Sequence, residues 1–271
     1  MEYVEVQGER LPVVGFGTWE LRGGTCYEAV RDALELGYRH IDTAQMYGNE
    51  GAVGRAIADS GVDREEILLT TKIPPRNLAP DDVRRSHEGS LRDLDVDRVD
   101  LLLIHWPSRS VPLEATLEAM RGLQEEGKTR HLGVSNFIPS LVEQSLEHAE
   151  ILTNQVEFHP FLTQSHLVEQ ATEAGHAVTA YSPLAKGRVA RDETLADIAE
   201  GHSKTPAQVA LRWLVQQPNV ITIPRSASAE HRAENLDVFD FTLTDDEIKR
   251  IGALNEEHRI IDPPSAPDWE R

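Results

Sequence analysis

The chain has 271 residues, of which 39% are apolar, and Cys26 is its one cysteine. This length allows one large core, and a single cysteine excludes an internal disulfide framework. The formal charge of −19, from 46 acidic and 27 basic residues, argues against a nucleic acid or an anionic membrane as partner. Every apolar run is too short to span a bilayer, and no secretory signal pattern opens the chain, so we expect a cytoplasmic protein.

The acidic residues are spread along the chain, and only five of the basic residues are lysines. Such a composition suggests a host with a salty cytoplasm, where a Debye length of about 3 Å near 1 M salt screens the repulsion between acidic side chains. We therefore hypothesise that the protein comes from a halophile and has an acidic, solvated surface.

Apolar runs alternate regularly with helical patterns after a small N-terminal hairpin around Gln7 and Gly8. The runs predict eight strands, at residues 13–17, 38–42, 67–72, 99–105, 129–134, 152–157, 177–181 and 220–223. The helical patterns lie at residues 25–36, 50–60, 80–94, 113–126, 139–148, 164–174 and 206–216. A further helix is predicted near 244–254, before a proline-rich tail at 262–271.

The predicted strands are continuously apolar, as in a parallel sheet that is buried on both faces. Eight βα units in about 250 residues predict an α/β fold, a (β/α)8 TIM barrel that forms one domain over residues 1–271. Gly15 and Gly17 resemble the start of a dinucleotide fingerprint, but a third glycine and the following helix are missing. A Rossmann turn is therefore a poor interpretation of this pair.

A barrel brings the carboxyl ends of its strands to one rim, and four chemically suitable side chains fall there: Asp42, Tyr47, Lys72 and His105. Lysine beside tyrosine is expected to lower the pKa of the phenol, and a buried lysine needs a carboxylate partner. His105 would orient a substrate oxygen towards the Tyr47 hydroxyl. Alone, each residue is as compatible with a turn, a core or a packing role, but together they suit carbonyl reduction by hydride transfer.

The motifs that carry these residues resemble those of the aldo-keto reductase superfamily over nearly the full chain, in the prokaryotic type that includes diketogluconate and methylglyoxal reductases. They are Gly-Phe-Gly-Thr-Trp (15–19), Ile-Asp-Thr-Ala-Gln-Met-Tyr-Gly-Asn-Glu (41–50), Thr-Lys-Ile (71–73), Leu-Leu-Ile-His-Trp-Pro (102–107), Gly-Val-Ser-Asn-Phe (133–137), Asn-Gln-Val-Glu-Phe-His-Pro (154–160), Ala-Tyr-Ser-Pro-Leu (180–184) and Ile-Pro-Arg-Ser (223–226). The resemblance implies a barrel closed at its bottom by the hairpin, with NADP(H) extended across the rim.

The resemblance also implies roles for individual residues. Asp42, Tyr47, Lys72 and His105 match the catalytic tetrad, with Tyr47 as the acid. Positions matching the nicotinamide site are Ser135, Asn136, Gln155 and Tyr181, and those along the pyrophosphate are Ser182 and Leu184. Trp19 and Trp106 match substrate-pocket positions beside Tyr47 and His105. No metal ligand set is expected.

The adenosine end departs from the family pattern. Arg225, Ser226 and His231 stand where NADPH-preferring members have Lys, Ser and Arg for the 2′-phosphate, and Glu234 and Asn235 match adenine contacts. Because a histidine is largely uncharged at pH 7, one phosphate contact is weakened. We therefore expect NADPH to be preferred, with appreciable use of NADH.

Two other functions fit parts of the pattern. Lys72 at a strand end would serve a barrel aldolase that forms a Schiff base, and the adenosine-end motif would then have no purpose. A barrel that binds a nucleotide and a partner without catalysis would leave the tetrad idle. A short segment at 108–112 suggests an open site for small aldehydes, 2-oxoaldehydes or keto sugars, and few exposed apolar stripes suggest a monomer.

Overall fold

A computed structural model describes residues 1–264 and 266–269. Its eight-stranded sheet is parallel throughout, in the order β10-β9-β8-β7-β6-β5-β4-β3. The strands are β3 (Phe16–Gly17), β4 (His40–Asp42), β5 (Leu68–Ile73), β6 (Val99–Ile104), β7 (Thr129–Ser135), β8 (Thr153–Glu157), β9 (Ala177–Tyr181) and β10 (Val220–Thr222). A parallel bridge between Val14 and Thr222 joins the two ends of this order, which confirms the barrel.

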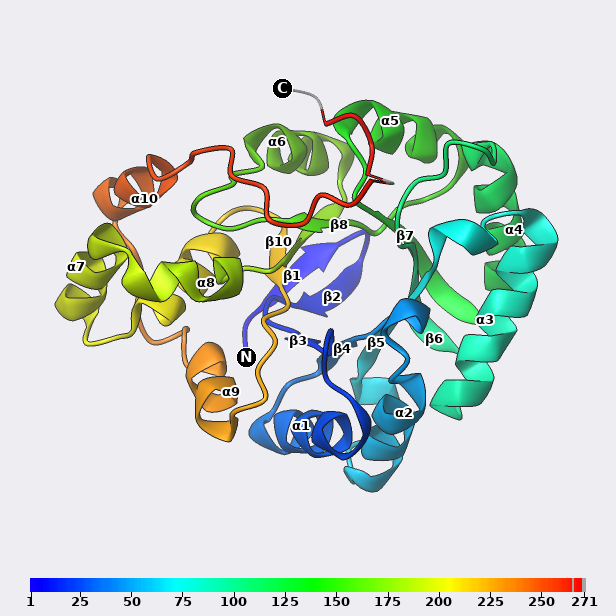
Figure 1. The fold of residues 1–271 in the computed structure, drawn as a ribbon, viewed down its shortest axis with the longest axis horizontal. Helices are drawn as coiled ribbons and strands as arrows, with labels where there is room; N and C mark the ends of the chain where they lie inside the picture. The colour runs from blue at the N-terminus through cyan, green and yellow to red at the C-terminus, as the bar shows by residue number, and fades with distance from the viewer. Residues whose placement is uncertain (265, 270–271) are drawn as a thin grey trace.

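Helices surround the barrel on its outside (Figure 1). They are α1 (Gly23–Leu36), α2 (Glu50–Asp59), α3 (Pro80–Leu94), α4 (Leu113–Glu125), α5 (Pro139–His148), α6 (Ser165–Ala174), α7 (Glu193–His202), α8 (Pro206–Val215), α9 (Ala229–Leu236) and α10 (Asp245–Gly252). Short 3-10 turns occur at η1 (Gln45–Tyr47), η2 (Arg64–Glu66), η3 (Pro75–Asn77) and η4 (Ala185–Arg191). The predicted helices are all present, with ends that differ by at most two residues.

The sequence analysis did not predict helix α7, and it gave no residue range for α9. Asp192 caps α7 by accepting a hydrogen bond from the Leu195 backbone N–H at 3.0 Å. Only Leu195, Ile198 and Ala199 of this helix are buried, so its apolar pattern is brief. The segment after β9 therefore contains two helices, α7 and α8, instead of the usual one.

Two glycines make the closing contact of the barrel possible. A Cβ atom on Gly15 would lie 2.6 Å from His40 Nδ1, and one on Gly17 would lie 2.7 Å from the Ile223 carbonyl oxygen. Gly15 thus lies against the His40 side chain of β4, and a Cβ atom there would also lie 3.0 Å from Ile223 Cγ2; the backbone of Gly17 approaches the segment after the last strand too closely for any larger residue. The glycine pair serves barrel closure, in agreement with the rejection of a Rossmann turn.

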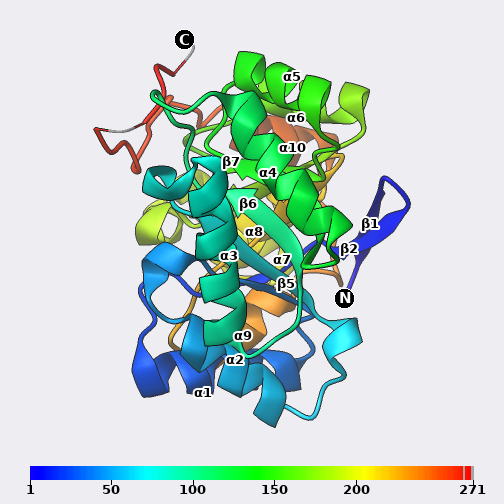
Figure 2. The same cartoon turned by 90° about the vertical axis from the view of Figure 1, so that its right-hand side faces the viewer.

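The N-terminal hairpin covers the bottom of the barrel. Strands β1 (Tyr3–Val6) and β2 (Glu9–Pro12) pair antiparallel, and Val6 and Leu11 are buried against Leu101, Leu103 and other residues of the barrel interior. Figure 2 shows this hairpin on the side of the barrel opposite the C-terminal segment. The expected closure of the bottom is confirmed.

The segment after α10 crosses the opposite end of the barrel (Figures 1 and 2). The Glu157 carboxylate, at the end of β8, accepts hydrogen bonds from the backbone N–H groups of Ile260 and Ile261, both at 2.8 Å. Arg109 donates to the Ala266 carbonyl oxygen at 2.8 Å. Of the predicted tail at 262–271, Ser265, Glu270 and Arg271 lie outside the described residues. Over the described part of the chain, we find no helix of the length and apolarity that crossing a membrane requires.

Candidate active site

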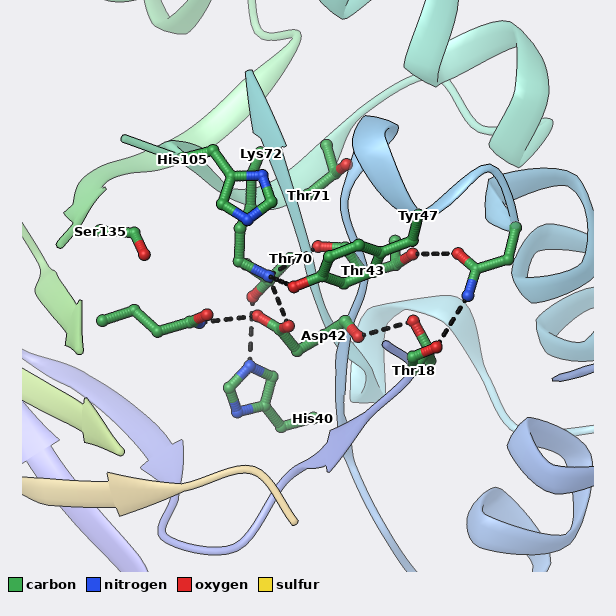
Figure 3. Close-up of polar contacts among 12 residues, drawn as sticks. Thr18, His40, Asp42, Thr43, Tyr47, Thr70, Thr71, Lys72, His105 and Ser135 are labelled. Atoms are coloured by element: carbon green, nitrogen blue, oxygen red, sulfur yellow. Dashed lines mark hydrogen bonds and ion pairs between the residues drawn. The ribbon is translucent and has the colours of Figure 1, made fainter. Parts of the chain in front are cut away.

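The four predicted tetrad residues meet at the carboxyl ends of three neighbouring strands (Figure 3). Asp42 ends β4, Lys72 is the penultimate residue of β5, and His105 immediately follows β6. Tyr47 ends the 3-10 turn η1, which follows β4. Parallel pairing of β4, β5 and β6 in register brings these positions side by side, although they are up to 63 residues apart in sequence (105 − 42).

Lys72 is the hub of the polar contacts. Its Nζ donates to Asp42 Oδ1 at 2.5 Å, to the Thr43 carbonyl oxygen at 2.9 Å and to the Tyr47 hydroxyl at 3.3 Å. Lys72 and Asp42 are each 1% exposed. Burial lowers the pKa of Lys72, and the Asp42 carboxylate opposes that shift. The ammonium is thus fully hydrogen-bonded inside the barrel, which offsets part of its desolvation cost.

The pKa of Tyr47 moves against the expectation from sequence. Burial raises it well above the ordinary value for tyrosine, and the Asp42 carboxylate raises it further. The expected lowering of the pKa was wrong because burial disfavours the phenolate, and the Asp42 carboxylate acts in the same direction. In the resting protein Tyr47 is therefore a firmly protonated hydroxyl.

His105 is a neutral imidazole. Burial lowers the pKa of His105 to about 3, and the nearby Lys72 ammonium acts in the same direction. Its ring lies edge-on to Tyr47, with 5.6 Å between the centroids. Among the described residues, no group hydrogen-bonds its buried Nδ1. A neutral ring beside the phenol can donate or accept one hydrogen bond from a bound oxygen without adding charge.

A network of polar groups outside the tetrad fixes the loop that carries Tyr47. Asn49 donates to the carbonyl oxygens of Thr18 and Leu21 at 2.9 and 3.0 Å, and accepts from the Thr43 hydroxyl at 2.7 Å. The Thr18 hydroxyl in turn donates to the Asp42 carbonyl oxygen at 3.0 Å. The sequence analysis assigned no role to Thr18, Thr43 or Asn49. All three lie within quoted motifs, Thr18 in the motif at 15–19 and the other two in the motif at 41–50.

The four residues predicted to hold the nicotinamide form a second polar group on β7, β8 and β9. Asn136 donates to the His105 carbonyl oxygen at 2.9 Å and to Ser135 Oγ at 3.0 Å, and accepts from the Tyr181 hydroxyl at 2.8 Å. Gln155 donates to Asp42 Oδ2 at 2.7 Å, which links this group to the tetrad. Ser135, Asn136 and Gln155 are buried, and Tyr181 is half-buried. The structure thus brings all four together beside the tetrad.

The positions predicted along the pyrophosphate follow β9. Ser182 has a φ of +50°, and Leu184 stands just before the 3-10 turn η4; both are half-buried. Ala185 and Lys186 also have positive φ values, of +46° and +50°. Three non-glycine residues with positive φ within residues 182–186 make a tightly turned segment directly after a barrel strand.

The adenosine-end residues lie after β10. Arg225 is exposed, Ser226 is 7% exposed, and His231 is exposed in the first turn of α9. Glu234 and Asn235 follow on the same helix, where Asn235 is 3% exposed. The N-terminus of α9 and the Arg225 guanidinium thus stand on one short segment, and both favour an anion.

The two predicted substrate-site tryptophans differ in environment. Trp106 is 7% exposed and lies edge-on to Trp269 of the C-terminal segment, with 6.2 Å between centroids. Trp19 is 39% exposed, and the Lys186 ammonium lies 5.4 Å from the centre of its ring. Trp106 follows His105 directly and so belongs to the wall beside the tetrad. Trp269 was not predicted, because its contact depends on how the C-terminal segment folds back.

The donor set fits a nicotinamide dinucleotide better than a metal. Buried amide and hydroxyl groups lie beside the tetrad, and an exposed guanidinium and a helix N-terminus lie beyond the end of the last strand. Amides suit the carboxamide of a nicotinamide, and cationic ends suit phosphates. Within the described ranges, no group of three or more His, Cys, Asp or Glu side chains is arranged to hold a metal ion.

Comparisons with known proteins agree with this geometry. The profile of the Aldo/keto reductase family matches residues 13–256, so the chain belongs to that family. It is an oxidoreductase that reduces carbonyl groups, and neither the aldolase nor the non-catalytic alternative is supported.

Individual relatives are similar over almost their whole length. Methylglyoxal reductase DkgB of Escherichia coli O157:H7 is 41% identical over 266 residues, covering 96% of this chain and 99% of that protein. Glyoxal reductase of Bacillus subtilis (strain 168) is 41% identical over 256 residues, covering 93% and 92%. A crystal structure of a candidate 2,5-diketo-D-gluconic acid reductase B has a TM-score of 0.98 and 41% identity, covering 100% of this chain and 98% of that one.

Proposed function

We propose that the protein reduces small aldehydes and ketones with NAD(P)H, and that Tyr47 donates the proton. The observation that carries this proposal is the Tyr47 hydroxyl 3.3 Å from the Lys72 ammonium, which is itself 2.5 Å from the Asp42 carboxylate. Asp42, Lys72, Tyr47 and His105 form the proposed catalytic set. A bound nicotinamide cofactor supplies the hydride.

The residues divide the work by their charge and position. Neutral His105 hydrogen-bonds the substrate oxygen and holds it near Tyr47. As negative charge develops on that oxygen, the Tyr47 hydroxyl gives up its proton, because an alkoxide is a far stronger base than a phenolate. The Lys72 ammonium then stabilises the phenolate that remains, and Asp42 keeps Lys72 charged despite its burial.

The proposed cofactor site has two ends. Ser135, Asn136 and Gln155 would bind the carboxamide and Tyr181 would stack on the nicotinamide ring, while Ser182 and Leu184 would line the pyrophosphate. At the other end, Arg225, Ser226 and His231 would hold the 2′-phosphate, and Glu234 and Asn235 the adenine. Since Arg225 is the one arginine or lysine among these three, we propose NADPH as the preferred cofactor with appreciable use of NADH. A strict NADH preference in kcat/KM would contradict this proposal.

The substrate class follows from the relatives and from the aromatic wall. Two similar proteins are named for the reduction of methylglyoxal and of glyoxal, which are small 2-oxoaldehydes. Trp106, with Trp19 as the predicted second member, would give a mostly apolar pocket around one polar anchor. We propose 2-oxoaldehydes first, then other small aldehydes and keto sugars, as substrates of a cytoplasmic monomer.

The test is NADPH oxidation with a panel of aldehydes and ketones, comparing the wild type with Tyr47→Phe. We expect kcat to fall by about 10²- to 10⁴-fold, while NADPH binding, followed by fluorescence, stays nearly unchanged. Tyr27→Phe is the matched control, because the Tyr27 hydroxyl bonds Asp59 on the protein surface. Full activity of Tyr47→Phe would show that the proposed acid is wrong.

A further inference from the structure

Arg225 already has an anionic partner within the chain. Its Nη2 donates to Glu20 Oε2 at 2.5 Å, and its Nε donates to the Trp19 carbonyl oxygen at 3.1 Å. Glu20 belongs to the segment after β3, and Arg225 to the segment after β10, so the pair spans the seam where the barrel closes. A Cβ atom on Gly17 would lie 3.9 Å from Arg225 Cβ, which shows how closely the two segments approach.

The conformation of Glu20 is unusual for its residue type. Its φ is +64°, in the left-handed region that residues with a Cβ rarely adopt. The Lys186 ammonium lies over the ring of the neighbouring Trp19, and Lys186 also has a positive φ. A strained backbone position whose side chain meets a charged group is a reason to look for a role in the adjacent site.

Arg225 is the accessible arginine of the segment after β10. The nearest other arginine on this segment, Arg232, donates to the Ser226 carbonyl oxygen at 3.2 Å and is paired with Asp32 at 2.6 Å. Arg232 is thus occupied and 5% exposed, whereas Arg225 and Glu20 are both exposed. A phosphate that binds at this segment therefore meets one accessible guanidinium, that of Arg225. This guanidinium is already paired with the Glu20 carboxylate.

We propose that Glu20 is a specificity-determining residue that narrows the preference for NADPH over NADH. The 2′-phosphate of NADPH must compete with the Glu20 carboxylate for Arg225, and it meets the repulsion of that carboxylate. NADH carries a 2′-hydroxyl, which needs no cation and which carboxylates accept as a hydrogen-bond donor in other dinucleotide sites. This inference rests on the proposed function, since it takes Arg225 as part of the 2′-phosphate site.

The experiment measures dissociation constants by fluorescence titration of the full-length protein with NADPH and NADH. Glu20→Gln keeps the size of the side chain and removes its charge. We expect this variant to bind NADPH about five- to tenfold more tightly, with NADH binding changed by less than about twofold. Competition by adenosine 2′,5′-bisphosphate against 5′-AMP should show the same difference without the nicotinamide.

Two further variants identify the cause. Glu65→Gln removes one negative charge from a surface carboxylate that pairs with Arg98 on another part of the barrel, and should leave both affinities unchanged. In the Arg225→Gln background, Glu20→Gln should have a smaller selective effect, because the competition for the guanidinium is absent and only the repulsion by the carboxylate remains.

The possible failures are distinct. Equal tightening of NADPH and NADH by Glu20→Gln, or no tightening of either, would overturn the role of Glu20 and leave the reductase proposal intact. A selective effect of the same size in the absence of Arg225 would also overturn it. If the wild type bound neither dinucleotide, the proposed function would fall, and this inference with it.

Discussion

The Asp42–Lys72 pair provides the charges that the proposed chemistry needs, and it also carries the free-energy cost of burying two charges in the barrel. Two buried charges are tolerable because each meets its partner and further polar groups, including Thr43 and Gln155. Removal of one member alone leaves the other charge buried without compensation. The same pair that would stabilise a Tyr47 phenolate is thus a structural requirement of the barrel interior.

Lys72→Met is therefore expected to destabilise the fold as well as abolish activity. We expect the free energy of unfolding to fall by about 3–5 kcal/mol, since Asp42 loses its cation. The double variant Lys72→Met/Asp42→Asn should recover part of that loss while remaining inactive. Urea unfolding followed by circular dichroism measures both; a single variant as stable as the wild type would contradict this account.

Three buried histidines should make the protein sensitive to mild acid. Burial lowers the pKa of His105 to about 3 and those of His40 and His176 to about 4. In the unfolded chain each takes up a proton below about pH 6.5. Their contribution to stability is therefore complete above pH 6.5 and is lost progressively as the pH falls towards the folded-state values.

His176 offers a clean test of this dependence, because neither of its ring nitrogens has a hydrogen-bond partner among the described residues. His176→Leu should lose about 2 kcal/mol less stability than the wild type between pH 7 and pH 5. Urea midpoints at the two pH values measure the difference. Parallel losses in variant and wild type would show that His176 does not contribute.

At the scale of elements, close helix packing depends on one glycine of α2. A Cβ atom on Gly54 would lie 2.1 Å from the Leu94 carbonyl oxygen at the end of α3, a backbone atom that cannot move aside. We expect Gly54→Ala to destabilise the protein by about 2 kcal/mol or more, in spite of the better helix propensity of alanine.

Gly24→Ala in α1 is the matched control, since nothing lies within 4 Å of a Cβ atom there. This variant should be neutral or more stable by up to about 1 kcal/mol, because alanine restricts the unfolded chain. Thermal unfolding of the two variants side by side gives the comparison. Equal effects of both substitutions would mean that the α2–α3 contact is looser than the structure shows.

The regular alternation of strands and helices was predicted from the sequence, and the helix that departs from this alternation was missed. The sequence-based strands agree with the structure except at their ends; β3, for example, contains only Phe16 and Gly17 besides the bridge at Val14. Helix α7 has as many buried side chains as α6, which was predicted; it was missed because an alternation of one helix with one strand left no place for a second helix between β9 and β10. Neither error moves a tetrad residue, because Asp42, Lys72 and His105 stand at the ends of strands that were correctly placed.

The whole molecule carries a formal charge of −19, which should make its stability depend on salt. We expect the melting temperature to rise between salt-free buffer and about 1 M KCl, because screening reduces repulsion among acidic side chains. Sucrose in place of KCl serves as a control for general solvent exclusion. Full stability and activity without salt would count against a halophilic origin.

Closure of the barrel also predicts how the molecule unfolds. The bridge between Val14 and Thr222 ties the first strand to the last, so neither half of the barrel has a complete sheet on its own. We propose that residues 1–271 form one domain with a single cooperative transition. Coincident transitions by tryptophan fluorescence and far-ultraviolet circular dichroism are expected; two separate transitions would contradict this.

Local sequence was sufficient for the barrel class and for bringing four chemically suitable side chains to one rim. Continuous apolar strands and glycine-terminated helices are local patterns, and a parallel barrel necessarily gathers strand ends at one rim. The rest depends on contacts between distant segments. The direction of the Tyr47 pKa shift depended on the burial of its hydroxyl and on the Asp42 carboxylate, and the Glu20–Arg225 pair joins residues 205 positions apart. Burial and through-space charge decide such properties, and neither can be calculated before the chain is folded.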